Sequence, residues 1–172
     1  MKRPFSGLSA FFFLSILFYS IQSMAAVIQP KSGAAMCEAL TVADFQSVGI
    51  MNATPPKTNV GEDGASAYCT YAGKSSATGG IELDVFHPAG ANAKEAMATE
   101  ETAIGESSSV QKSIAIPGTD DARWSPNAVS GGPTFATMTV RRGTLVFVIG
   151  IPANKNSQDQ LLKLSDLVLK RL

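Results

Sequence analysis

The residues with the chemistry for binding or catalysis gather in the second half of this sequence. Asp120 and Asp121 stand side by side, and Arg123 and Trp124 follow directly. Adjacent carboxylates can bind a cation or act as acid and base, and a tryptophan ring can stack on a ligand. Asp side chains in a turn also accept backbone N–H bonds, and a single Trp in a small domain is commonly core, so both interpretations stay open.

A basic pair lies close behind this loop in the sequence. Arg141 and Arg142 precede Gly143 at the tip of an expected hairpin, where they would grip an anion or simply remain solvated. Recognition residues are commonly carried on loops of a rigid scaffold. We therefore take the loop at 120–124 and the arginine pair together as the candidate binding site.

Established catalytic signatures are missing from the sequence. It contains no glycine-rich phosphate loop, no dinucleotide fingerprint, no His-Glu-x-x-His and no Gly-x-Ser-x-Gly. The only histidine, His87, cannot supply a multi-histidine metal site, and Asp84 three positions earlier lies on the opposite strand face. We expect no catalytic residues, no metal and no cofactor. The remaining enzymatic alternative uses carboxylates alone, Asp120 with Asp121 or Glu82 with Asp84.

The two cysteines, Cys37 and Cys69, are expected to form a disulfide. Two thiols in an oxidising compartment most often pair, and no Cys-x-x-Cys motif is present. The closed loop of about 33 residues would stabilise the fold by roughly 3.5–4 kcal/mol on the chain-entropy model. A nucleophilic thiol is the weaker alternative, because it needs a base to generate the thiolate.

The N-terminal segment predicts export. Lys2 and Arg3 precede an apolar run at 8–19, and small residues Ser23 and Ala25 follow. This is the three-part pattern of a secretory signal, and about 12 apolar residues fall short of the roughly 20 that span a membrane. An uncleaved membrane anchor is the alternative.

These features predict the organisation of the chain. We expect a signal peptide at 1–25, cut after Ala25 or else after Ala26, then a flexible lead-in at 26–36 and a single domain at 37–172. Losing two of the 14 basic residues leaves 12 against 14 acidic ones, a net charge of −2. Nothing in that balance favours nucleic acid or an anionic membrane as partner. The expected location is the periplasm or the medium.

Hydrophobic periodicity and turn residues predict the elements that position these groups. Helices are expected over 37–49, 92–104 and 157–172, and strands over 67–72, 81–87, 110–116, 135–141 and 144–151. Residues 51–66, with Pro55-Pro56, are expected to form a long loop. The order α-β-β-α-β-β-β-α predicts an α+β fold with a mainly antiparallel five-stranded sheet and helices packed on it.

Two capping boxes are predicted at helix starts. Thr41 with Asp44, and Ser157 with Gln160, have the spacing in which each side chain bonds the other residue's backbone N–H. Gly49 suits the left-handed conformation that ends a helix.

Several short motifs carry a resemblance. They are Cys-Glu-Ala-Leu-Thr-Val-Ala-Asp-Phe at 37–45, Tyr-Cys-Thr-Tyr at 68–71, Ile-Pro-Gly-Thr-Asp-Asp-Ala-Arg-Trp at 116–124, and Arg-Arg-Gly at 141–143. The pattern resembles uncharacterised exported domains of bacterial envelopes, such as actinobacterial lipoproteins of unknown function and extracytoplasmic sensor domains. The chain departs from them in lacking a lipid-attachment cysteine and in having Thr119 where glycine is usual. The resemblance implies a fold and a disulfide, and no reaction.

The sequence therefore favours an exported, non-enzymatic binding or sensing domain of the bacterial envelope. The partner would be another envelope protein or a small ligand. A structural or inhibitory partner of another envelope protein is the first alternative, and it would be favoured by a bare apolar sheet face. A carboxylate-based enzyme is the second.

Overall fold

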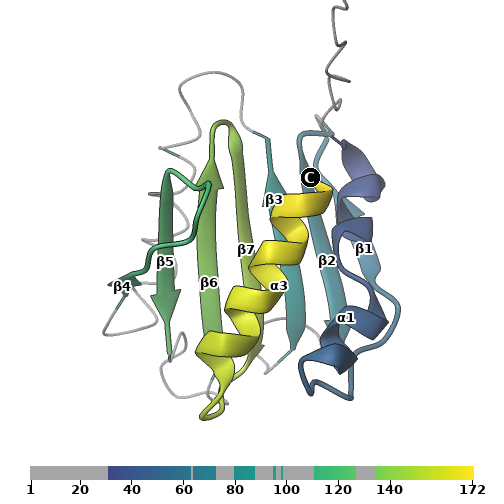
Figure 1. Cartoon of the computed structure of the whole chain (residues 1–172). Coiled ribbons are helices and arrows are strands. Elements are labelled where there is room, and N and C mark those ends of the chain that lie inside the picture. The colour runs from purple at the N-terminus through teal and green to yellow at the C-terminus, as the bar shows by residue number, and fades with distance from the viewer. Residues whose placement is uncertain are drawn as a thin grey trace, which may run out of the picture.

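A single antiparallel sheet organises the chain in the computed structural model, which describes residues 31–62, 64–72, 80–87, 95, 98, 111–126 and 135–172. Its strands are β1 (Lys57–Val60), β2 (Ser66–Ala72), β3 (Ile81–Phe86), β4 (Lys112–Ser113), β5 (Asp121–Ser125), β6 (Phe135–Arg142) and β7 (Leu145–Pro152). The seven strands are ordered β1-β2-β3-β7-β6-β5-β4, and each pairs antiparallel with its neighbours. The 3-10 helix η1 (Gly33–Ala39) and the α-helices α1 (Val42–Ser47) and α3 (Ser157–Arg171) lie together on one side of it (Figure 1).

The predicted five-stranded sheet and its element order are wrong. Strand β1 forms inside the segment expected to be a loop, and its four residues are all exposed, so no apolar alternation marks it in the sequence. Strand β5 forms where a turn was expected. Its five residues are mixed in size and polarity, so no apolar alternation marks them in the sequence, and they become a strand by pairing with β6. Of the strand expected at 110–116, residues 111–116 are described, and among them Lys112–Ser113 alone form a strand.

The helices differ from expectation as well. The helix predicted over 37–49 is two elements, since Leu40 and Thr41 are extended between η1 and α1. The helix predicted over 92–104 lies outside the described residues except for Glu95 and Ala98, which are helical. The signal peptide predicted at 1–25 also lies outside them. Within the described ranges, no helix is both long and apolar enough to cross a membrane.

The core forms around β7, the most apolar strand. Every residue of β7 except Pro152 is buried, and β7 lies between β3 and β6. Helix α3 crosses these strands and buries Leu161, Leu164 and Val168 against them (Figure 1). This helix and the sheet account for the centre of the hydrophobic core.

The other half of that sheet face is covered by η1, which is fixed to β2. The predicted disulfide between Cys37 and Cys69 is confirmed, with the two Cα atoms 5.5 Å apart. The hydroxyl of Tyr71, on the same strand, lies 2.7 Å from the carbonyl oxygen of Cys37 and 3.0 Å from that of Leu40. Burial raises the pKa of Tyr71 above its usual range, which keeps the hydroxyl protonated as a donor.

A second attachment joins the two ends of the domain. Arg171 grips Asp44 through two bonds, Nη1 to Oδ2 at 2.5 Å and Nη2 to Oδ1 at 3.0 Å, and Nη1 also donates to the carbonyl of Ala39. The predicted capping box of Thr41 and Asp44 is confirmed. The hydrogen bond from Arg171 holds the pKa of Asp44 at about 2, against 3.8 ordinarily, with smaller help from Thr41.

The second predicted capping box does not form. Helix α3 is preceded by Asn156, which makes no side-chain cap, and the hydroxyl of Ser157 accepts from the backbone N–H of Asn154 at 2.6 Å. Gln160 instead donates through Nε2 to the carbonyl of Val48 at 2.8 Å. The side chain that was expected to cap α3 therefore joins α3 to the end of α1.

We predict that Asp44→Asn lowers the free energy of unfolding by about 2 kcal/mol at pH 7, because the bond from Arg171 holds the pKa of Asp44 at about 2 in the folded protein against 3.8 ordinarily. Because the folded pKa is depressed, this stabilisation is present above pH 3.8 and is lost as the pH falls toward 2. Urea unfolding of both proteins across that range should show the difference shrinking.

The matched control removes an exposed ion pair of similar type. Asp166 and Lys170 are in contact on α3, but their side chains are 57% and 66% exposed, so Asp166→Asn should change stability by less than about 0.5 kcal/mol. Equal losses in the two variants, or an Asp44→Asn deficit that does not depend on pH, would contradict the role assigned to Asp44.

Candidate functional site

The first part of the predicted site is joined by the structure. Asp120 Oδ2 lies 3.3 Å from Arg141 Nη1 and accepts the backbone N–H of Gly143 at 2.6 Å. The carboxylate thus bonds both to the end of β6, through Arg141, and to the tip of the β6–β7 hairpin, through Gly143. Asp120 therefore connects the loop before β5 to that hairpin.

The other charges of the predicted site also have partners within the fold. Asp121 and Arg123 pair with each other at 3.1 Å along β5. Arg142 Nη1 donates to the carbonyl of Leu169 at 2.6 Å, near the C-terminal end of α3. A guanidinium group there also meets the negative end of the helix dipole. These contacts give each residue a structural role, in the region where Arg141 and Arg142 were expected to bind an anion.

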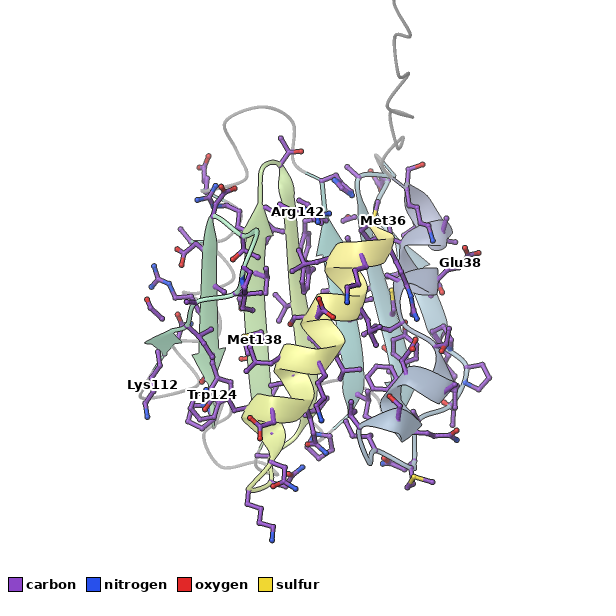
Figure 2. The ribbon with its side chains drawn as sticks, in the orientation of Figure 1. Met36, Glu38, Lys112, Trp124, Met138 and Arg142 are labelled. Atoms are coloured by element: carbon purple, nitrogen blue, oxygen red, sulfur yellow. A yellow bond between two sulfur atoms is a disulfide. The ribbon has the colours of Figure 1, made fainter. Side chains whose placement is uncertain are left out.

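Trp124 does not share a surface with these charges. Side chains alternate along β5, so Trp124 and Ala122 face the core side while Asp121 and Arg123 face the other way. The Trp124 ring packs against the core opposite Met138 of β6, and Lys112 Nζ lies 5.5 Å from its centroid. Figure 2 places Trp124 and Arg142 toward opposite ends of the sheet. The predicted loop and hairpin therefore do not form one groove with the tryptophan.

His87 follows β3 directly, and its backbone N–H donates to the carbonyl of Ala65 at 2.7 Å. Its Nε2 atom is buried without a hydrogen-bond partner, and burial lowers the pKa of the imidazole. Across the described ranges, no three His, Cys, Asp or Glu side chains gather as a metal site would require.

A recess that the sequence analysis missed lies at the opposite edge of the sheet. It has a volume of about 470 Å³ and is bounded by η1, the start of α1, the chain before β1 and β1 itself. Its lining residues are Ala34, Cys37, Glu38, Leu40, Thr41, Val42, Pro55, Pro56 and Thr58. Cavities of 300–1,000 Å³ with mainly apolar walls are typical of ligand sites. Glu38, the one charged residue of the lining, lies on the outer side of η1 (Figure 2).

The local sequence explains why this recess exists. Cys37 on one wall is fixed to the sheet by its disulfide, and Leu40 is held by the Tyr71 hydroxyl. Pro55 and Pro56 on the other wall have no N–H and fixed φ angles, and this stretch forms neither helix nor strand. The signal in the sequence was a long loop with two prolines close to a tethered cysteine, and long loops of this kind are often functional.

Comparisons of the chain with models of protein families, with curated proteins and with solved structures find no match. The resemblance to exported envelope domains therefore stays a prediction.

The position of Trp124 generates a prediction about its role. Because the ring packs against the core, Trp124→Ala should lower the free energy of unfolding by about 3 kcal/mol, the lower end of the range for buried aromatic truncations. Lys112→Ala removes only the cation above the ring and should cost under about 1 kcal/mol. Chemical denaturation measures both; an unchanged midpoint for Trp124→Ala would restore the ring as a ligand platform.

Proposed function

We propose that this protein is an exported, non-enzymatic binding or sensing domain of the bacterial cell envelope, and that its ligand binds in the recess beside β1. The observation that carries the proposal is the recess itself, an apolar hollow of about 470 Å³ whose walls are tied to the sheet. A preformed site avoids much of the entropy cost of ordering a flexible one on binding.

The lining gives the chemistry of the ligand. Leu40, Val42 and the two prolines offer apolar contact, which favours an aliphatic or aromatic group. Glu38 adds one negative charge, and its side chain is 74% exposed with only a loose contact to Lys31 at 3.8 Å. An apolar group with a cation close by is the best match.

The two alternatives receive less support. A structural partner was expected to need a bare apolar face, but the large apolar side chains exposed in the described residues are Met51, Val60 and Tyr68, which lie on separate elements or faces. A carboxylate-based enzyme was expected to use Asp120 with Asp121, and these pair with different arginines. Glu82 and Asp84, on β3, also engage in interactions.

Filling the recess tests the proposed function. Ala34 is exposed and lines the recess, so Ala34→Trp should weaken binding of the uncharged apolar fluorophore N-phenyl-1-naphthylamine to the folded domain at least tenfold. Ala43→Trp, on the exposed side of α1 away from the lining, is the matched control and should bind like the unmodified protein. Fluorescence titration measures both; equal affinity in all three proteins would contradict binding in the recess.

Export has its own test. We expect the mature protein to begin at Ala26, because the charged head, the short apolar run and the small residues before it match a cleavable signal. Intact-mass measurement of protein from the periplasm or medium should give the mass of residues 26–172. A full-length species extracted from the membrane would show that the segment is retained.

A further inference from the structure

We propose that the recess is one part of a longer groove, and that its ligand is an extended peptide segment that adds to the sheet as a strand beside β1. The peptide would place an apolar side chain in the recess and a Lys or Arg, two residues away, against Glu38. This proposal rests on the proposed function, since it names the class of ligand that the recess takes.

The first argument is the backbone at the edge of the sheet. Strand β1 is one of the two edge strands of the sheet, and just after it Gly61 N donates to Ser66 O at 3.0 Å. In an antiparallel ladder the bonded pairs alternate, so Lys57 and Asn59 bond toward β2. The N–H and C=O groups of Thr58 and Val60 therefore point away from the sheet, and no described residue bonds them.

The second argument is the direction of the side chains. Thr58 lies opposite Cys69, and Val60 lies opposite Ala67. Cys69 and Ala67 are both buried on the side of the sheet that η1 covers. Side chains of directly paired residues share a face, so Thr58 and Val60 project on the same side as the recess. A peptide residue paired with Thr58 would thus direct its own side chain into the recess that Thr58 lines.

Charge complementarity fixes the chemistry of the neighbouring position. Residues two apart on a strand share a face, so the peptide residue two positions from the apolar one also faces the η1 side. Glu38 projects there with most of its side chain exposed. A Lys or Arg at that position would pair with Glu38, while residues at the intervening positions face away.

The length of the edge sets the expected strength. Peptide addition to a sheet edge takes affinity from main-chain bonds and specificity from pockets for alternate side chains. Only two residues of β1 offer outward backbone groups, so we expect a dissociation constant on the order of 10–100 μM.

A second copy of the chain is the competing occupant. Pairing β1 with β1 about a two-fold axis would put both η1 helices on the same side of the joined sheet, where each flanks its own β1. A single peptide strand needs no such room, which favours the peptide.

The probe is a fluorescein-labelled blocked peptide, Thr-Thr-Leu-Thr-Lys-Thr-Thr, whose Leu and Lys share a face. The matched control, Thr-Thr-Leu-Lys-Thr-Thr-Thr, has the same composition with Leu and Lys on opposite faces. Fluorescence anisotropy with the mature domain should show binding of the first peptide and at least tenfold weaker binding of the second. Glu38→Gln should reduce the difference between them.

Val60→Pro tests the backbone directly, because it removes an N–H that points outward and leaves the bonds to β2 in place. We expect an unchanged unfolding midpoint, at least a tenfold loss of peptide affinity, and unchanged binding of N-phenyl-1-naphthylamine. If the variant does not fold, methylating the peptide gives the same information: N-methyl Leu should abolish binding, and N-methyl on the Thr between Leu and Lys should not.

The outcomes separate the two proposals. Fluorophore binding without peptide binding, or peptide binding that ignores the position of the N-methyl group, would overturn strand addition and leave the recess as a binding site. Failure of both probes would overturn both proposals. A concentration-dependent dimer in sedimentation that Val60→Pro abolishes and the peptide does not displace would assign the edge to a second copy, against this inference.

Discussion

Strand β7 carries apolar side chains on both of its faces, so both faces of the sheet must be covered along its length. Helix α3 meets this requirement on one face with a stripe of Leu161, Leu164 and Val168. The pairing of β7 with β3 and β6 then places it near the middle of the sheet and sends the polar strands to the edges. Exposed residues of β1 and β4 are tolerated there because edge strands have one unpaired side.

One helix cannot cover a face seven strands wide. The β1–β2 half is covered by η1 and α1, and elements of seven and six residues are too short to be stable alone. They are held in place by a few specific contacts. Helix η1 has the disulfide at Cys37 and the hydrogen bond from the Tyr71 hydroxyl. Helix α1 has two bonds from α3, one to Asp44 and one from Gln160 to the carbonyl at its C-terminal end. Because η1 and α1 are attached to the sheet and to α3 at these contacts, space remains beside them, and the recess occupies that space.

The sequence predicted what local patterns determine. The hairpin of β6 and β7, the closing helix, the Thr41–Asp44 capping box and the left-handed Gly49 all followed from periodicity or from residue types with one strong preference. The disulfide followed because two cysteines have only one way to pair. Strands β1 and β5 could not be predicted, because their exposed or mixed residues become strands only through pairing with a neighbour. Gln160 likewise bonds Val48, distant in sequence, in preference to its own helix end.

The same distinction explains why the recess lies at the opposite edge of the sheet from the site that the sequence predicted. The charged and aromatic residues at 120–124, with Arg141 and Arg142, predict a binding site, yet in the fold their charges bond to each other, to Gly143 and to Leu169. A charge that is hydrogen-bonded within the fold must give up that bond before it can hold a ligand, whereas Glu38 makes, among the described residues, only the 3.8 Å contact to Lys31. Backbone groups still able to form bonds lie at β1, in Thr58 and Val60, because one side of an edge strand is unpaired, and residue type does not reveal them. Any residue at those two positions other than proline would present the same N–H and C=O groups, so the binding capacity inferred for this edge comes from the topology of the sheet, and only its specificity comes from side chains such as Glu38.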